Sequence, residues 1–408
     1  MRAKERIFSM GITGILDTLF GNVTHVTWQM AVMWLIGGVL IFCAIKFEME
    51  PTLLLPMGFG AILVNLPLSG ALGTWEFDTL LDKFVLTDAH GPVSVLLKAG
   101  IDNELFPLLL FIGIGAMIDF GPLLRNPKLM LFGAAAQFGI FFTLCMASLF
   151  FNSNIASSIA IIGAADGPTS IFVANTLLGG TSDSGYIGAI TVAAYSYMAL
   201  VPIVQPPVIR LLTTKKERMI RMDDQGMPVS KLTRILFPII VTVITGLVSP
   251  QSVALVGFLM FGNLIRECGV LGSLSDTAQK VLANLVTLLL GITVAGHMQA
   301  ENFLKPGTLL ILGLGLIAFV ADTAGGVLFA KVMNLFTKKK VNPMIGAAGI
   351  SAFPMSSRVV HKMGLKEDPQ NFLLMPAAGA NVAGQIASVI AGGMILNFAQ
   401  AGFPALFG

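Results

Sequence analysis

The sequence is poor in charged residues, cysteine and histidine, and each shortage excludes a class of protein. Only 12% of its 408 residues are charged, whereas about 25% are charged in an ordinary soluble domain. The three cysteines are scattered through apolar surroundings, and no cysteine or histidine spacing is typical of a disulfide framework or a transition-metal site. The net charge is +3, and no basic tract has aromatic residues between its charges. A soluble globular protein is therefore excluded, and nucleic acid is not an expected partner.

Long apolar runs take the place of the missing charge. They are about twenty residues long, which is the length at which a helix spans the hydrocarbon of a bilayer, whereas a transmembrane barrel needs alternating strands of about ten residues. Several runs are interrupted by glycine, proline or polar residues. We therefore predict an all-α polytopic membrane protein, a helical bundle of about ten to twelve membrane segments that contact the lipid bilayer. The runs lie near 28–47, 53–70, 105–121, 129–151, 155–178, 186–212, 232–249, 251–266, 280–297, 307–336, 342–356 and 371–398.

The charges outside these runs predict which loops share a side of the membrane. Two basic loops, Thr213–Met222 and Lys338–Lys340, are separated by four predicted spans and so lie on one side, which the positive-inside rule makes cytoplasmic. The acidic segment Trp75–Glu104 has no spanning pattern, so we expect an extramembrane insertion there. The pattern does not determine on which side of the membrane this insertion lies. Residues Ile7–Phe20 have the pattern of an interfacial amphipathic helix, so we expect no cleaved targeting peptide.

A weak internal repeat divides the chain. An offset of 186 residues matches Gly163 with Gly349 and Pro168 with Pro354, and the segment 115–121 resembles 262–269 at another offset. Because secondary transporters are often built from such repeats, we predict a repeat of inverted topology with broken helices at the functional site. The predicted divisions are an N-terminal part with the amphipathic helix, the first spans and the acidic insertion, a first half, a linker and a second half, at 1–104, 105–218, 219–229 and 230–408.

Asp166 lies in the motif Asp-Gly-Pro-Thr-Ser inside an apolar run. Proline removes a backbone donor and glycine tolerates a turn, so the motif predicts a broken helix. Freed carbonyls and the hydroxyls of Thr169 and Ser170 then converge on a carboxylate at membrane depth, where a charge is costly and usually functional. We expect a small cation to bind here; the alternative is an interfacial turn with a solvated aspartate.

All three tyrosines of the chain lie between positions 186 and 197. Tyr186 is expected in an aromatic belt at the membrane interface. Tyr195 and Tyr197 are deeper in their run, so we expect them to line a polar cavity. A phenol there could donate a proton, because its pKa is ordinarily near 10.

A second broken segment begins at Asn342-Pro343 and continues through Ser351 to Arg358. Asn342 and Ser351 could ligate a cation, although an asparagine before proline also fits a helix cap. Arg358 could hold a carboxylate; the alternative is a charge that reaches the interface from a helix end, together with Lys362.

Polar residues in later runs complete the set of candidates. Asn381 and Gln385 are four residues apart and share one helix face, where they either join the site or form a helix-packing hydrogen bond. Asp322 belongs either to a proton path or to a helix contact.

Taken together, these segments resemble the beta subunit of the sodium-translocating, biotin-dependent decarboxylases, a family that includes oxaloacetate, glutaconyl-CoA and methylmalonyl-CoA enzymes. The resemblance extends from about residue 106 to 393, and its most specific motifs lie at 163–169, 193–202 and 342–354. Carried over position by position, it implies a sodium-binding role for Asp166 and functional roles at Asn342, Gly346, Ser351, Arg358, Asn381 and one of Tyr195 and Tyr197.

The resemblance also implies a function and partners. It implies that this chain decarboxylates carboxybiotin, consumes a proton and exports Na+ across a bacterial cytoplasmic membrane. Biotin would be carried by a partner, not by this chain, in an oligomeric complex with a biotin carrier protein, a carboxyltransferase subunit and a small membrane subunit.

These roles combine into one hypothesis. Asp166 binds sodium with Asn342 and Asn381, while Ser351 and a tyrosine help to hold a second ion. Arg358 binds the carboxylate of carboxybiotin, for which Ser351 is a second candidate contact, and the tyrosine supplies the proton. The main rival is a secondary transporter that couples sodium or proton flow to a small carboxylate; a structural scaffold would explain neither the breaks nor the buried aspartate.

Overall fold

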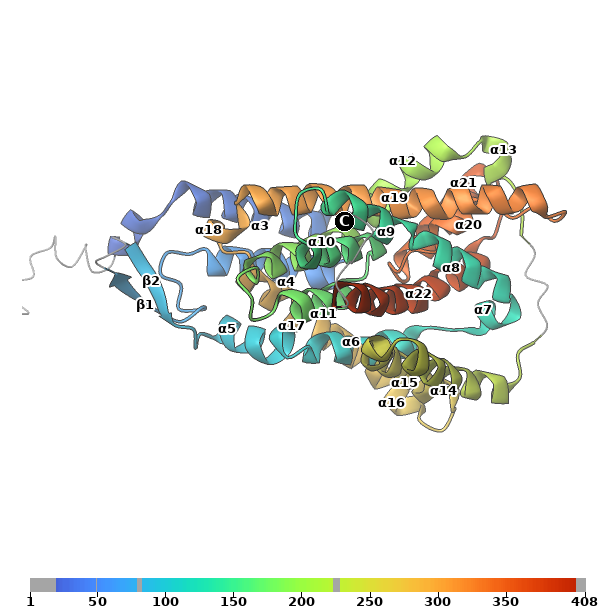
Figure 1. Ribbon diagram of the computed structural model, residues 1–408, viewed down its shortest axis with the longest axis horizontal. Coiled ribbons are helices and arrows are strands. Elements are labelled where there is room, and N and C mark those ends of the chain that lie inside the picture. The colour runs from blue at the N-terminus through green and yellow to red at the C-terminus, as the bar shows by residue number, and fades with distance from the viewer. Residues whose placement is uncertain (1–19, 49, 79–82, 223–227, 401–408) are drawn as a thin grey trace, which may run out of the picture.

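The computed structural model describes residues 20–48, 50–78, 83–222 and 228–400 (Figure 1). Within them, the chain is helical apart from a single two-stranded sheet. The prediction of an all-α membrane protein is confirmed. The predicted amphipathic helix at Ile7–Phe20 lies outside the described residues, except for Phe20, and so does the middle of the predicted linker.

Six helices are long and apolar enough to span a membrane, and a seventh span results if a pair bent by 66° at 185–212 is counted as one. Three shorter apolar helices add partial crossings at Pro51–Val64, Leu105–Met117 and 153–164. The number of ten to twelve segments therefore stays a prediction. The six long spans are Trp28–Phe47, Pro127–Ala147, Lys231–Val248, Gly272–His297, Pro306–Phe336 and Leu374–Ala399.

The N-terminal part is a helical hairpin followed by a small extramembrane insertion. The hairpin helices cross at two glycines: a Cβ on Gly37 or on Gly58 would lie 2.6 Å from the carbonyl oxygen of the other. In the insertion, β1 and β2 pair antiparallel, with Trp75 opposite Leu86. The elements are η1 (Gly21–His25), α3 (Trp28–Phe47), α4 (Pro51–Val64), β1 (Thr74–Asp78), β2 (Lys83–Asp88), α5 (Pro92–Leu96) and η2 (Leu97–Asp102).

The first half is broken twice. One break is the turn at Gln137, where backbone bonds reach back only three residues, from Gln137 N to Ala134 O and from Ile140 N to Gln137 O. The other is at Ala165, which has a left-handed φ of 52°. The elements are α6 (Leu105–Met117), α7 (Gly121–Arg125), η3 (Pro127–Leu129), α8 (Met130–Ala136), α9 (Phe138–Ala147), α10 (Ser153–Ala160), η4 (Ile161–Ala164), α11 (Gly167–Leu178), α12 (Gly185–Leu212) and α13 (Lys215–Arg218).

The second half has its main break between α20 and α21, over residues 348–354. The elements are α14 (Lys231–Val248), η5 (Pro250–Ser252), α15 (Val253–Glu267), α16 (Gly272–Asp276), η6 (Thr277–Leu282), α17 (Ala283–Val294), η7 (Ala295–His297), α18 (Ala300–Phe303), α19 (Pro306–Phe336), α20 (Met344–Ala347), α21 (Met355–Glu367) and α22 (Leu374–Gln400).

Two features join the halves at the centre of the bundle. The segments matched in the sequence, 115–121 and 262–269, begin in helices α6 and α15, which cross closely: a Cβ on Gly115 would lie 1.9 Å from Leu259 O, and one on Gly262 would lie 2.1 Å from Ile112 O. The breaks at 165–166 and 348–354 also meet, because Ser351 N donates to Ala164 O at 3.1 Å.

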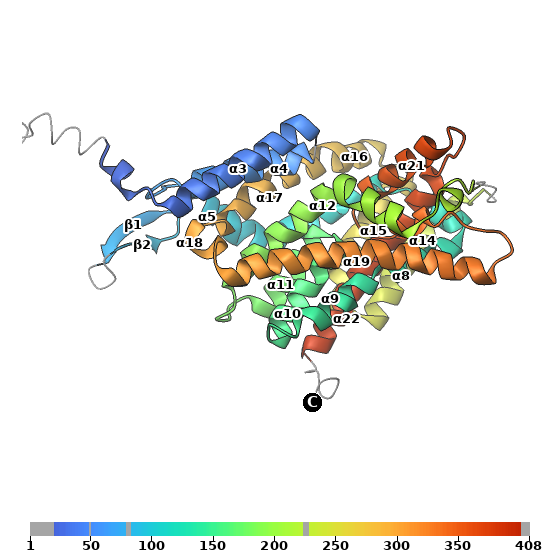
Figure 2. The same ribbon diagram turned by 90° about the horizontal axis from the view of Figure 1, so that it is seen from above.

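The extramembrane charges separate to opposite ends of the molecule. Helix α13 lies at the same end of the molecule as the C-terminal end of α19, which precedes Lys338–Lys340 (Figures 1 and 2). The β1–β2 hairpin of the acidic insertion lies at the other end. The two basic loops thus share a side, as the positive-inside rule predicts, and the acidic insertion lies on the opposite side.

Candidate ion site at the broken helices

Asp166 is the residue at which η4 ends and α11 begins. Its side chain caps α11 and faces Thr169 N at 3.5 Å, and Pro168 occupies the first turn, where no donor is needed. The left-handed Ala165 turns the chain just before it. These local features leave the carboxylate only 3% exposed inside the bundle.

Neutral hydroxyl groups surround the carboxylate. Thr169 Oγ1 donates to Asp166 Oδ2 at 2.7 Å, and Ser388 Oγ donates to the same oxygen at 3.0 Å. Ser170 Oγ donates to the Asp166 carbonyl at 2.8 Å. No ion pair reaches Asp166 from the part of the chain that the structure describes. A buried carboxylate without a counter-charge is costly, and oxygen-rich breaks of this kind coordinate Na+ or H+ in transporters.

Helix α22 presents one polar face to both breaks. Asn381, Gln385 and Ser388 follow helical spacing, so they lie on the same side. Asn381 Nδ2 donates to Ile350 O at 2.6 Å, and Gln385 Nε2 donates to Ser351 O. The amide oxygens of Asn381 and Gln385 are buried and accept no hydrogen bond from the part of the chain that the structure describes, so two acceptor oxygens beside the breaks are available to a ligand.

Ser351 lies at the junction of these contacts. Its hydroxyl donates to Gly384 O at 3.0 Å, and its backbone N–H reaches the first break through Ala164 O. The predicted residues Asp166, Thr169, Ser170, Ser351, Asn381 and Gln385 are therefore brought to one region. Ser388, which the sequence analysis did not select, belongs with them, and its position seven residues after Asn381 is the signal that could have found it.

The two tyrosines have different surroundings. Tyr195 is 1% exposed, its ring packs against Gly167, and its hydroxyl has no hydrogen-bond partner among the described residues. It is also close enough to Asp166 for the two groups to interact electrostatically. The Tyr197 ring instead packs against Gly315, and its hydroxyl donates to Leu312 O on α19. The geometry associates Tyr195, not Tyr197, with the Asp166 site.

Asn342 and Gly346 lie away from Asp166. Asn342 Nδ2 donates to Arg218 O at 2.9 Å and to Ile220 O at 2.8 Å, while its Oδ1 accepts from Met344 N at 3.1 Å. These bonds use the Asn342 side chain as a helix cap and a loop anchor. Gly346 allows α20 to approach α19, because a Cβ there would lie 1.9 Å from Gly326 O.

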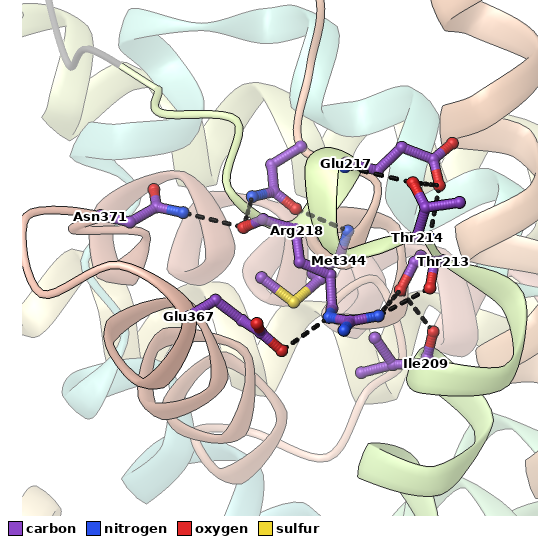
Figure 3. Close-up of polar contacts among 9 residues, drawn as sticks. Ile209, Thr213, Thr214, Glu217, Arg218, Met344, Glu367 and Asn371 are labelled. Atoms are coloured by element: carbon purple, nitrogen blue, oxygen red, sulfur yellow. Dashed lines mark hydrogen bonds and ion pairs between the residues drawn. The ribbon is translucent and has the colours of Figure 1, made fainter.

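Arg218 organises the basic end around Asn342 (Figure 3). Its Nε pairs with Glu367 Oε1 at 2.8 Å, and its Nη1 donates to Thr213 O at 2.6 Å. Its carbonyl also accepts from Asn371 Nδ2 at 2.9 Å. This cluster ties the end of the first half to helix α21 of the second half.

Arg358 lies on α21, exposed, and close enough to Glu50 for their charges to interact. An exposed guanidinium next to a carboxylate is chemically suited to bind a second carboxylate. Asp322 lies on α19 and is fully buried. It is not one of the residues that form the polar contacts of Asp166.

Comparisons with known proteins identify the family of the chain. Residues 29–399 match the family described as "Na+-transporting oxaloacetate decarboxylase beta subunit". The chain is 48% identical to the methylmalonyl-CoA decarboxylase subunit beta of Propionigenium modestum, over 90% of this chain and 94% of that protein. It is 48% identical to the glutaconyl-CoA decarboxylase subunit beta of Acidaminococcus fermentans, over 95% and 98% of the two chains. It is 44% identical to the oxaloacetate decarboxylase beta chain of Klebsiella pneumoniae, over 93% and 97%. The predicted function as a subunit that couples decarboxylation to sodium transport is thus confirmed at family level, and the chain belongs to the family of Na+-transporting decarboxylase beta subunits.

Proposed function

We propose that this chain decarboxylates carboxybiotin carried by a partner protein and uses the reaction to export sodium with the consumption of one proton. The observation that carries the proposal is the buried Asp166 carboxylate, which has hydroxyl partners but no counter-charge where two broken helices meet. A bound sodium ion would supply that charge. Moving one charge against 100 mV requires about 2.3 kcal/mol, so export has to be driven by the chemistry.

The sodium ligands that we propose are oxygens of the two breaks and of α22. Asp166 provides the charge, and Thr169, Ser170 and Ser388 provide hydroxyl oxygens that already surround it. The free amide oxygens of Asn381 and Gln385, with the hydroxyl of Ser351, are the remaining candidates. Asn342 and Gly346 act from a distance, by holding α20 and the basic loop in place.

Arg358 and Tyr195 are the residues that we assign to the reacting group. Carboxybiotin supplies a carboxyl group whose loss as CO2 leaves a nitrogen that requires a proton. Arg358 binds the carboxylate at the basic end of α21. Tyr195 holds a proton at its hydroxyl, which is buried, unpartnered and close to Asp166; the tyrosine can therefore respond to whether sodium is bound there.

We also propose a setting for the pump, which the family resemblance and the basic end of the molecule support. The basic end with α13 and Arg358 faces the cytoplasm, where a biotin carrier protein, a carboxyltransferase subunit and a small membrane subunit assemble with this chain. The membrane is the cytoplasmic membrane of a bacterium.

Purification of the native complex tests this function. We expect avidin to retain the chain together with a biotinylated partner, and the complex to decarboxylate one of methylmalonyl-CoA, glutaconyl-CoA and oxaloacetate only when sodium is present. In proteoliposomes, ²²Na+ uptake should accompany the reaction. Asp166→Asn should abolish both activities, whereas Asp276→Asn, at an exposed carboxylate paired with Lys280, should leave them unchanged.

Two results would contradict the proposal. Full decarboxylation and transport by Asp166→Asn would remove Asp166 from the site. Uptake of a carboxylate solute by this chain alone, without a biotinylated partner, would instead support the secondary-transporter alternative.

A further inference from the structure

Helix α19 carries a second buried carboxylate, which the sodium site does not use. Asp322 lies near the middle of this helix and is 0% exposed. Figures 1 and 2 show α19 as one long helix that extends along much of the molecule, and it packs against α12, α9, α20 and α8. Asp322 is therefore enclosed by protein at membrane depth.

The immediate neighbour of Asp322 is the start of α9. A Cβ on Gly139 would lie 2.1 Å from Asp322 Oδ1 and 2.6 Å from Asp322 N, so only glycine allows this approach. The backbone N–H groups of Gly139 and Ile140 face the carboxyl group, because the turn at Gln137 interrupts the helix just before them. Neither carboxyl oxygen makes a hydrogen bond of ordinary geometry.

No charged group compensates Asp322 within the described residues. No ion pair or side-chain hydrogen bond reaches it, and no charged side chain acts on it electrostatically. The titratable and charged side chains on the elements packed most closely against α19, and on α19 itself, are Tyr186, Tyr195, Tyr197, Arg210, Cys145, Glu301 and Lys331. Since none of them pairs with Asp322, the carboxyl group is stable here as a neutral acid.

The surroundings of Asp322 favour a proton over a metal ion. The groups that face it are backbone N–H donors, which repel a cation but stabilise a carboxylate at a helix N-terminus. The site is therefore equipped for both protonation states: burial favours the acid, and the start of α9 accommodates the anion. A sodium ion would need several acceptor oxygens, and no hydroxyl of the described residues hydrogen-bonds to Asp322.

Gly139 also connects Asp322 to the sodium site. A Cβ on Gly163 would lie 3.3 Å from Gly139 C and from Ile140 N, and Gly163 belongs to the η4 turn that ends just before Asp166. A movement of this turn on sodium binding would thus change the packing of α9 against Asp322.

We propose that Asp322 is a proton-binding site of the pump, and that its proton exchange is linked through the Gly139–Gly163 contact to sodium occupancy at Asp166. The inference rests on the proposed function, in which each turnover consumes a proton. At Asp322 the exchange breaks and remakes only the carboxyl O–H bond. Tyr195 gives its hydroxyl proton to the nitrogen from which CO2 departs, and the proton of Asp322 then replaces it on the tyrosine oxygen. The bonding pair of the carboxyl O–H bond stays on the carboxylate, and solvent returns a proton to Asp322.

Labelling with dicyclohexylcarbodiimide tests the protonated state without a mutation. The reagent adds to a protonated carboxyl group: the carboxyl oxygen bonds to its central carbon, and the proton moves to its nitrogen. A groove of about 410 Å³ is lined by Gln137, Phe138 and Gly325 among others. These residues are within three positions of Gly139 or Asp322 in the chain, so an apolar reagent would approach the pair from this groove. We expect mass spectrometry of the wild-type complex to find adducts on Asp322 and on Asp166, with NaCl protecting Asp166 directly and changing the labelling rate of Asp322.

The labelling has two outcomes that decide the proposal. In a complex that decarboxylates its substrate, absence of an adduct on Asp322 would overturn the proton site. If Asp322 is labelled at the same rate with and without sodium, the link to Asp166 is wrong. Failure of the wild-type complex to decarboxylate any of the tested acids would instead contradict the proposed function itself.

The variant Asp322→Asn, which resembles the neutral acid in shape, tests turnover. We expect kcat for decarboxylation to fall at least about tenfold and the KM for sodium to stay within about twofold. In wild type, kcat should fall at high pH where Asp322 loses its proton, and this fall should be absent from the variant. The control is Asp276→Asn, which should match wild type. Unchanged kcat and an unchanged pH profile in Asp322→Asn would show that Asp322 is only a helix contact.

Discussion

Asp166 and Asp322 are two buried aspartates with opposite surroundings. Asp166 caps a helix that starts at a break, and two hydroxyls donate to it. Asp322 faces the start of another helix after a turn, but its contact is the bare backbone of Gly139. Both carboxyl groups lack a cationic partner among the described residues. Each therefore needs a positive charge from outside the chain, and the neighbouring atoms decide whether a metal ion or a proton supplies it.

The difference teaches that burial alone does not identify an ion site. A hydroxyl that donates to a carboxylate can turn its lone pairs to a bound cation, whereas a backbone N–H offers only a donor. Two aspartates that are similarly buried thus have different neighbours: hydroxyl oxygens surround Asp166, and backbone N–H groups face Asp322. The first variant below changes both regions together, and the tyrosine and hydroxyl variants change one region and leave the other as an internal control.

The largest effect is expected from Gly139→Ala. The added Cβ would overlap Asp322 and the α19 backbone, so α9 and α19 must separate, at a cost of about 1–3 kcal/mol or more. Because Gly139 also touches the turn before Asp166, we expect both aspartate regions to fail and decarboxylation to become undetectable. Yield and thermal stability of the purified complex, with activity, measure this. Gly313→Ala, in open space on α19, should keep wild-type stability; a loss there as large as in Gly139→Ala would refute the packing argument.

The next largest effects are expected from tyrosine-to-phenylalanine variants, which distinguish the surroundings of Asp166 from those of α19. Tyr195→Phe removes a free hydroxyl beside Asp166, so we expect kcat to fall about 100-fold with little change in folding. Tyr197→Phe removes one hydrogen bond to α19, which should reduce the free energy of unfolding by about 1 kcal/mol and leave most activity. Steady-state kinetics and thermal unfolding of both variants are the measurements. If Tyr197→Phe is the inactive variant, the tyrosine that holds the reaction proton is Tyr197, which contacts α19, and not Tyr195.

Hydroxyl deletions give a smaller and more selective effect. Ser388→Ala removes one donor to Asp166, and we expect the KM for sodium to rise about tenfold, equivalent to about 1.4 kcal/mol. Thr323→Val removes a buried hydroxyl that has no partner, one residue from Asp322, and should leave the sodium KM unchanged. Sodium titrations of the decarboxylation rate distinguish the two. Equal shifts would mean that the two aspartates do not differ in ligand chemistry.

The sequence predicted those parts of the site that depend on local rules. Asp-Gly-Pro predicts a break at Asp166 because proline and glycine act on their own neighbours, and the spacing of Asn381 and Gln385 predicts a shared face. The position of Asn342 could not be predicted, because its partners Arg218 and Ile220 are more than a hundred residues earlier in the chain. The contact of Asp322 with Gly139 was equally hidden, since glycines are common in this chain and few of them meet a carboxylate.

Asp368 provides a third carboxylate, outside the membrane, against which both buried aspartates can be compared. The hydrogen bond from Arg221, at 2.6 Å, lowers the pKa of Asp368 below its ordinary value of about 3.9. A folded-state pKa that is lowered stabilises the protein above the unfolded value, and the contribution is lost as the pH falls through the folded value. We therefore expect Asp368→Asn to reduce the melting temperature slightly at pH 7, and the difference from wild type to shrink as the pH falls below about 4. Asp276→Asn, in an exposed pair one helical turn apart, should show no comparable difference. A deficit of Asp368→Asn that persists at low pH would mean that its charge is not what stabilises the loop, and that Asp368, like Asp322, acts as a neutral group.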